Sequence, residues 1–381
     1  MSTTSDARRT AVPLAQPSIT DREVELVTEA LRSDVLAMGP FADEFERRIA
    51  DLAGRRHAIA CSSGTAGLHL AVRGLGIGDG DEVITTAFSF VASANCMLYE
   101  RAVPRFVDIE EETLGLDPAL VDAAATERTR GILPVDVFGN PCRIDELEQL
   151  AAARGWALIE DSCEALGSRL GGRPLGSFGQ AAVFAFYPNK QITTGEGGAV
   201  VTDDDGLAEA LRSMRNQGRD SDGTWLRHVR LGFNYRLDEL SAALGVAQLE
   251  RLAELQAGRR QVAAWYAEAF AGDDWLTLPR TRTGAVVDWF VYVVRLADHI
   301  DRNRVIEALE EHGIPARPYF SPIHLQPFYR ERFGFRPGDL PVTERVAAST
   351  LALPFSSLLR SDEVDRVAES LRSVVRDLGG A

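Results

Sequence analysis

The feature that most constrains the fold is a regular alternation, between residues 57 and 202, of short apolar runs with longer amphipathic stretches. The apolar runs include "HAIAC", "DEVITT", "WALIEDS", "AAVFAFY" and "GGAVVTDD", and amphipathic stretches such as "RIDELEQLAAARG" separate them. Short continuous apolar runs are typical of strands that are buried on both faces. The pattern therefore predicts an α/β domain with a largely parallel sheet, in which ligands bind at the carboxyl ends of the strands.

A different pattern begins after Leu249. A long polar helical stretch leads into the strand-like run "DWFVYVVRL", a second helical stretch "RNRVIEALEEHG" and a proline-rich loop. A chain of 381 residues is long enough for one large domain and one smaller domain. We therefore predict a disordered polar tail over residues 1–12, a large domain over residues 13–250 and a small α+β domain over residues 251–381.

The acidic composition bears on the partners of the chain. With 41 basic and 56 acidic residues the formal net charge is −15, which disfavours binding to nucleic acid and to anionic membranes. The four cysteines form no CxxC pair, so we expect free thiols and no metal site. Residues 1–10 are polar, and no apolar run approaches the roughly 20 residues of a membrane helix. We expect a cytoplasmic protein.

One lysine stands where the apolar run "FAFYP" gives way to a polar, glycine-rich turn. An exposed lysine has a pKa near ~10.4 and is a poor nucleophile at neutral pH, whereas apolar surroundings favour the free amine. Lys190 is therefore a candidate catalytic amine, with an ordinary solvated side chain as the alternative.

Two further stretches carry candidate functional groups. In "LIEDSCEALGS", Asp161 follows a predicted strand, where a carboxylate caps a helix, binds a metal, or holds a proton on the nitrogen of an electron-sink pyridine. In "SSGTAGLHL", small residues begin a helix, whose free N–H groups and dipole suit a phosphate. Gly64, Thr65 and Ala66 are the candidate donors, and an ordinary helix start is the alternative.

The order of these features is more specific than any one of them. A phosphate-type turn, an aromatic loop, Asp161 and Lys190 follow one another along the chain. An amine for a Schiff base, an acid for a pyridinium, a helix N-terminus for a phosphate and an aromatic ring for stacking are the parts that pyridoxal 5′-phosphate requires. We therefore predict pyridoxal 5′-phosphate as the cofactor.

The chain resembles the sugar aminotransferases of the DegT/DnrJ/EryC1/StrS family, which have fold type I of the pyridoxal-phosphate enzymes. Four motifs carry the resemblance, in the family's order: "SSGTAGLHLA", "IEDSCEALGS", "FAFYPNKQITTGEGGAVVT" and "GFNYRLDELSAALG". The resemblance runs from "GPFADEFERRIA" to "LPFSSLL", nearly the whole chain. It implies an α/β fold with a mostly parallel seven-stranded sheet, a smaller C-terminal α+β domain and aminotransferase activity.

The resemblance also implies a role for each matching residue. Lys190 would carry the cofactor as a Schiff base and later move a proton, and Asp161 would keep the pyridine nitrogen protonated. Phe88 would stack on one face of the ring. Asn234 would reach the phosphate of the neighbouring subunit, which makes the active unit a homodimer. The phosphate would be held by Gly64, Thr65 and Ala66.

Two positions depart from the family's pattern. Relatives commonly carry Ser five residues before the lysine, where it donates to the phosphate, and Ala185 stands here. One hydrogen bond to a charged group, worth roughly 1.5–3 kcal/mol, is then missing or replaced by water. Relatives often carry Gln or His three residues after the aspartate, and Glu164 stands here. Its carboxylate would accept a hydrogen bond from the 3-hydroxyl of the cofactor or from the substrate amine.

The family's usual reaction implies L-glutamate as amino donor and a nucleotide-linked keto-sugar as acceptor. The run "FYPNKQITTGEGG" is most similar to members that act at C4. We therefore expect conversion of dTDP-4-keto-6-deoxyglucose to the 4-amino-4,6-dideoxy sugar. The alternatives are C3 amination of a 3-keto-sugar, amination of a cyclitol ketone, and a non-catalytic regulator that binds the cofactor.

Seven residues are candidates for binding this substrate. Aromatic and imidazole side chains are expected on the sugar side of the site and on a loop that closes over it, and the alternative for the histidine is a purely structural role. The diphosphate of the substrate requires basic donors, and the alternative for each arginine is a surface ion pair. The candidates are Tyr187, Tyr319, His324, Tyr329, Arg219, Arg230 and Arg236.

Overall fold

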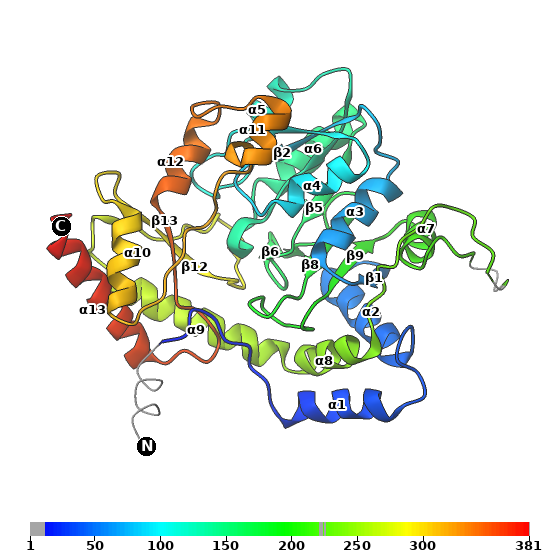
Figure 1. Cartoon of the computed structure of the whole chain (residues 1–381), viewed down its shortest axis with the longest axis horizontal. Coiled ribbons are helices and arrows are strands. Elements are labelled where there is room, and N and C mark those ends of the chain that lie inside the picture. The colour runs from blue at the N-terminus through cyan, green and yellow to red at the C-terminus, as the bar shows by residue number, and fades with distance from the viewer. Residues whose placement is uncertain (1–11, 221–223, 225, 381) are drawn as a thin grey trace.

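A computed structural model describes residues 12–220, 224 and 226–380, and a seven-stranded sheet forms its centre (Figure 1). β2, β3, β4, β5 and β8 pair in parallel, whereas β9 is antiparallel to both of its neighbours. The mostly parallel sheet predicted from the apolar runs is therefore confirmed. In spatial order the strands are β1 (His57–Cys61), β9 (Gly198–Thr202), β8 (Ala181–Ala185), β5 (Ala157–Asp161), β4 (Thr129–Leu133), β2 (Glu82–Thr86) and β3 (Val103–Val107).

The direction of β9 follows from the connection that precedes it. Residues 186–197 contain no helix, and a parallel return usually needs a helical crossover. The chain turns back instead, and the Phe186 N–H donates to the Gly197 carbonyl at 2.9 Å while the Thr194 N–H donates to the Phe186 carbonyl at 3.0 Å. This turn carries Lys190 and holds it at the edge of the sheet where β8 ends.

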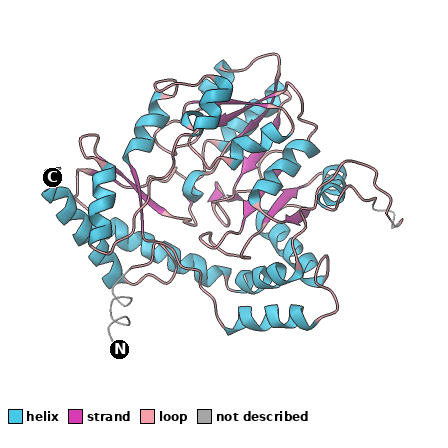
Figure 2. Cartoon of the chain, in the orientation of Figure 1, coloured by secondary structure: helices cyan, strands magenta, loops and turns pink. Residues whose placement is uncertain are grey.

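Helices cover both faces of the sheet (Figure 2). Strand residues alternate between the two faces: Ile59 and Cys61 pack in one core cluster, and Ala58 and Ala60 in another. Burial on both faces explains the continuous apolar runs. One face packs against α3 (Gly64–Gly74), α4 (Ala92–Tyr99) and α7 (Asp205–Arg215); the other packs against α2 (Pro40–Ala53), α5 (Pro118–Ala123), α6 (Ile144–Arg154) and α8 (Glu239–Glu250), on which α1 (Asp21–Arg32) lies.

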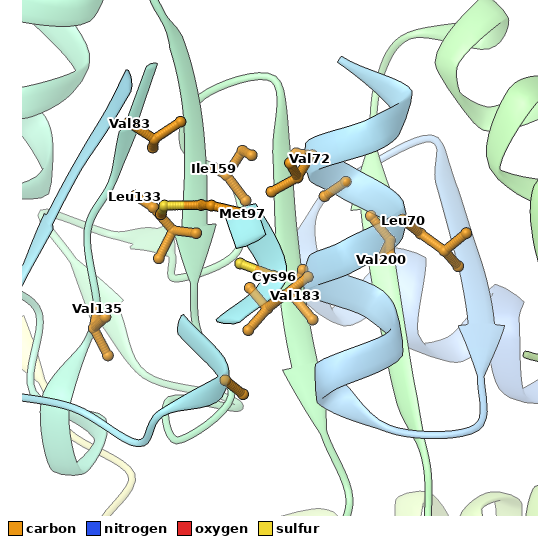
Figure 3. Close-up of a cluster of buried hydrophobic side chains, with 14 of the residues drawn as sticks. Leu70, Val72, Val83, Cys96, Met97, Leu133, Val135, Ile159, Val183 and Val200 are labelled. Carbon is orange, nitrogen blue, oxygen red and sulfur yellow. The ribbon is translucent and has the colours of Figure 1, made fainter. Parts of the chain in front are cut away.

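Figure 3 shows the core between the strands and the helices α3 and α4. Val83, Leu133 and Ile159 of three parallel strands meet Met97 of α4 there, and all four side chains are fully buried. The helices that begin at the carboxyl ends of the strands are therefore held rigidly, which fixes the position of their N-termini.

The chain after Arg251 builds a second core. α9 (Leu252–Ala269), α10 (Arg302–Glu311) and α13 (Ser361–Asp377) pack with an antiparallel sheet of β10 (Leu276–Thr277), β12 (Tyr292–Leu296) and β13 (Thr350–Leu353). A third small sheet joins β11 (Ala285–Val286) to β6 (Arg169–Leu170) and β7 (Arg173–Pro174). The remaining helices of the described residues are α11 (Pro327–Phe333), α12 (Pro341–Ser349) and the single turns η2 (Val137–Gly139) and η3 (Ile323–Leu325).

The division into two domains near residue 250 stays a prediction, which the break between α8 and α9 at Arg251 supports. Of the predicted tail, residues 1–11 lie outside the described residues. Val12 is 2% exposed within the second core, so the prediction of disorder was wrong for that residue. No helix in the described ranges combines the length and the apolar character needed to cross a bilayer.

Candidate active site

A cavity of about 520 Å³ opens where β1, β5 and β8 end, at the carboxyl edge of the sheet. Parallel strands bring their carboxyl ends to one edge, so residues from distant parts of the sequence meet there. Eight of the site residues that were predicted from the sequence line this cavity together: Gly64, Thr65, Asp161, Glu164, Ala185, Tyr187, Lys190 and Tyr319.

Lys190 is the only lysine of the chain. Its side chain is 13% exposed, and Nζ lies 3.3 Å from Glu164 Oε1 and 3.8 Å from the centre of the Phe290 ring. The carboxylate and the aromatic face both attract the ammonium. They hold the amine within the cavity and keep it from the solvated position of an ordinary surface lysine.

Asp161 ends β5 and is 4% exposed. Its Oδ2 accepts a hydrogen bond from Ser93 Oγ at 2.7 Å, and its Oδ1 accepts one from the Cys163 N–H at 3.2 Å. Ser93 Oγ also lies 2.7 Å from Ser89 Oγ. A hydroxyl has one proton to donate, so Ser93 donates to Asp161 and Ser89 donates to Ser93. The two serines thus orient a carboxylate that faces the cavity.

The N-terminus of α3 reaches the same cavity. Ser63 is the N-cap, and its Oγ accepts a hydrogen bond from the Ala66 N–H at 3.1 Å. The Ala66 amide is therefore already bonded, and Ala66 is not among the described residues that line the cavity, so its role as a phosphate donor stays a prediction. Gly64 and Thr65 remain there with the positive end of the helix dipole.

Gly64 has a packing reason to be glycine. A Cβ added at this position would lie 2.7 Å from the Cβ of Ala185 and 3.0 Å from Cys163 Sγ. The strand that ends at Ala185 therefore approaches the start of α3 closely, and a small side chain at residue 185 accompanies that approach.

Glu164 is buried and uses both carboxylate oxygens. Oε2 accepts from the Phe138 N–H at 2.9 Å, while Oε1 faces Lys190. Burial raises the pKa of Glu164 above its ordinary value, and the positive charge of Lys190 opposes that rise. The Glu164 carboxylate is thus a proton acceptor beside the amine of Lys190.

Phe88 is a correction to the predicted ring-stacking residue. Phe88 is fully buried and contacts the rings of Phe138 and Phe320 edge to face. Phe90, two residues later, lines the cavity and is 62% exposed. The reason is local: β2 ends at Thr86, and the irregular turn that follows directs Phe88 into the core and Phe90 to the cavity.

Two of the candidates from the proline-rich loop do not line this cavity. His324 is fully buried, and its Nε2 lies 3.0 Å from Glu344 Oε1, so the alternative of a structural histidine is the correct one. The hydroxyl of Tyr329 donates to Asn95 Oδ1 at 2.7 Å. Tyr329 lines an adjoining cavity of about 820 Å³ that shares Phe90 with the first.

The four candidates on residues 216–236 also lie outside the cavity lining within the described part of the chain. Asn234 is exposed, and its backbone pairs with that of Asn216. Arg236 donates to Asn216 Oδ1 at 2.9 Å, and Arg219 and Arg230 are partly exposed. A single chain therefore does not bring this segment to its own cavity.

Sequence reasoning missed several residues of the site. Ser89 and Ser93 are four residues apart in the stretch that follows β2, and hydroxyls at this spacing were a usable signal. Phe290 lies in the segment before β12, and no motif in the sequence around it indicates that it belongs to a site. Asn189 also lines the cavity, and its Oδ1 is buried without a hydrogen-bond partner among the described residues.

These groups fit pyridoxal phosphate. The amine of Lys190 fits its aldehyde, Asp161 fits its ring nitrogen, and the amides of Gly64 and Thr65 fit its phosphate. The Phe90 ring supplies a stacking surface.

Comparison with known proteins supports the same assignment. The DegT/DnrJ/EryC1/StrS aminotransferase family matches residues 17–372. The GDP-perosamine synthase of Caulobacter vibrioides is 39% identical over 369 residues, which cover 96% of this chain and 98% of that protein. The solved structure of DesI in the presence of its TDP-sugar product has a TM-score of 0.89 at 35% identity and covers 97% of this chain and 94% of that chain. The PLP form of Spr1654 from Streptococcus pneumoniae has a TM-score of 0.91 at 28% identity, over 97% and 99% of the two chains.

The family match spans most of the sequence, the fold matches those of solved sugar aminotransferases, and the cavity holds the groups that the cofactor requires. The chain belongs to the DegT/DnrJ/EryC1/StrS aminotransferase family and is a pyridoxal-phosphate-dependent aminotransferase.

Proposed function

We propose that this aminotransferase transfers the amino group of L-glutamate to C4 of a nucleotide-linked 4-keto-6-deoxyhexose, with dTDP-4-keto-6-deoxyglucose as the first choice. One observation carries the proposal: Lys190 and Asp161 face a single cavity at the N-terminus of α3. The relative in Caulobacter vibrioides is named for GDP-perosamine, and DesI was solved with a TDP-sugar product. Both names support a nucleotide-linked sugar as the substrate class.

The residues of the cavity divide the work as follows. Lys190 would hold the cofactor through its amine, and the same amine would carry a proton to and from the substrate carbon that bears the nitrogen. Asp161, oriented by Ser93, keeps a proton on the ring nitrogen. The chemistry that pyridoxal phosphate would supply there is an electron sink for that substrate carbon. The N-terminus of α3 binds the phosphate through the amides of Gly64 and Thr65.

The substrate reaches this site from the side of Tyr187 and Tyr319. Tyr187 is 53% exposed at the rim, and burial raises the pKa of Tyr319 to about 12, so its hydroxyl stays protonated and donates at neutral pH. We also propose that the active unit is a homodimer in which Asn234 reaches the cofactor phosphate of the partner subunit. The exposure of Asn234, away from its own cavity, supports this arrangement.

Two measurements test the proposal. Glutamate should abolish the absorbance of the bound aldehyde form, whereas a regulator without turnover would keep it. The resulting amine form is then offered the dTDP- and GDP-linked 4-keto-6-deoxyglucoses, a 3-keto isomer and a cyclitol ketone. We expect the highest kcat/KM with a 4-keto-sugar. Preference for the 3-keto isomer or the cyclitol would replace the C4 proposal with one of those alternatives.

The single lysine makes the covalent test unusually clean. Borohydride reduction of the holoenzyme should leave one pyridoxyl label, on Lys190, and the only other primary amine is that of the N-terminus. Lys190→Ala should lose both the label and turnover. Turnover of that variant at the wild-type rate would refute the assignment of Lys190.

A further inference from the structure

A buried arginine outside the cavity contacts the backbone of Lys190 and the backbone of the aromatic residue next to its amine. Arg259 lies in α9 and is 4% exposed. Its Nη2 donates to the Lys190 carbonyl at 2.7 Å, and its Nη1 donates to the Phe290 carbonyl at 2.9 Å. The Phe290 ring lies 3.8 Å from Lys190 Nζ. The guanidinium of Arg259 therefore connects the backbones of the two residues whose side chains form this amine–ring contact.

Among the described residues, Arg259 has no acidic partner, although a buried cation usually has one. It forms no ion pair within the described residues, and its Nε has no hydrogen-bond partner there. Burial lowers the pKa of Arg259 to about 10. A buried charge without a counter-ion is costly, so its remaining contacts keep the guanidinium in place. Besides the two carbonyl bonds, these are a longer bond of 3.4 Å from Nη1 to the Trp289 carbonyl and the Phe355 ring, whose centre lies 5.7 Å from the guanidinium carbon.

The geometry of the guanidinium matters as much as its charge. Its planar fork presents donors in fixed directions, which suits two carbonyls from different segments. The next residue strengthens the connection, because Gln191 Nε2 donates to the carbonyls of Glu164 and Asp288 at 2.5 and 2.9 Å. Gln191 is therefore bonded directly to the backbone of Asp288 and Glu164, and Lys190 is connected to Phe290 through Arg259.

We propose that Arg259 is a positioning residue for Lys190. Its fork fixes the lysine backbone relative to Phe290, and so holds the amine between the aromatic ring and the Glu164 carboxylate where it meets the cofactor aldehyde. Arg259 does not itself line the cavity. The inference rests on the proposed role of Lys190 as the residue that condenses with the cofactor, a step that forms a C=N bond and releases water.

The test measures how fast the apoenzyme captures pyridoxal phosphate. Aliquots are reduced with borohydride, and the mass increment on Lys190 gives the rate. Arg259→Met removes all the carbonyl bonds of the guanidinium, and Arg259→Gln keeps one donor group without the fork. Lysine is avoided because it would add a second reactive amine. Arg302→Met is the matched control, since Arg302 is a partly buried arginine that donates to the carbonyls of Ala347 and Thr350, away from the cavity.

We expect Arg259→Met to capture the cofactor roughly tenfold or more slowly, because misplacement of a reacting group by about 1 Å costs up to ~10²-fold. The induced circular dichroism of the bound cofactor should also fall, a signal that loss of stability alone does not change in folded protein. Arg302→Met should keep the wild-type capture rate at a comparable loss of Tm.

Wild-type capture and dichroism in folded Arg259→Met would overturn the inference, as would equal slowing in Arg302→Met. Where Arg259→Met does not fold, Arg259→Gln decides by the same two signals. Failure of the wild type to label Lys190 would instead refute the proposed function, so the two failures are distinguishable.

Discussion

Removal of the Ser93 hydroxyl should weaken catalysis through Asp161. Ser93 Oγ donates to Asp161 Oδ2 at 2.7 Å in a buried setting, and the remaining bond, from the Cys163 N–H, is longer at 3.2 Å. A hydrogen bond to a charged group is worth roughly 1.5–3 kcal/mol, and each ~1.4 kcal/mol corresponds to tenfold in rate. Full loss of this bond in the transition state therefore lowers kcat/KM about 10- to 150-fold.

One effect opposes this loss. A carboxylate that accepts fewer hydrogen bonds is a stronger base, so it holds the proton of the ring nitrogen more firmly. Orientation should dominate, because Asp161 without Ser93 keeps a single hydrogen bond and its side chain turns more freely. We therefore expect Ser93→Ala to lie near the lower end of the range, about tenfold in kcat/KM.

The assay is the second half-reaction, in which the amine form of the enzyme is mixed with the keto-sugar and the return of absorbance is followed. Ser89→Ala is the matched control, because Ser89 bonds to Ser93 and not to Asp161. It should cost less than roughly threefold, or about 0.6 kcal/mol. A Ser93→Ala enzyme within twofold of wild type, or equal losses in both variants, would refute this reasoning.

Three further predictions concern cofactor binding and stability. Phe90→Leu should weaken the affinity for the cofactor with little change in urea unfolding. Phe88→Leu should instead lower the free energy of unfolding by about 1 kcal/mol and leave the affinity for the cofactor nearly unchanged. The reverse pattern would restore Phe88 as the stacking ring. Gly64→Ala should raise the Kd for the cofactor, because the Cβ of the new alanine would displace the start of α3. Gly78→Ala should leave the Kd unchanged, because the space around residue 78 is open. Equal Kd values for the two variants in a fluorescence titration would contradict this prediction. Burial, and after it the neighbouring carboxylate of Glu160, raises the pKa of Asp136 well above its ordinary value. From about pH 4 upward the native state therefore keeps a proton on Asp136 that the unfolded state has released. The free energy of unfolding then falls by up to about 1.4 kcal/mol per pH unit. Asp136→Asn should flatten that fall in urea unfolding between pH 5 and 8, and parallel curves for the two proteins would count against it.

The sequence alone determined the fold class and the centre of the site. Apolar runs separated by helical stretches specify buried parallel strands, and such strands end at one edge of the sheet. Asp161 ends a run of this kind, and Gly64 and Lys190 follow shortly after two others, so their convergence follows from local pattern and topology together.

Only the tertiary structure decided which groups complete the site. Phe90 lines the cavity where the sequence suggested Phe88, because the turn after β2 has no fixed period from which the direction of a side chain can be read. Phe290 and Arg259 come from segments at least 69 residues after Lys190 in the chain. His324 has the right chemistry for a site but is buried against Glu344. Contacts between distant segments depend on how layers pack against one another, and no local repeat in the sequence encodes that packing.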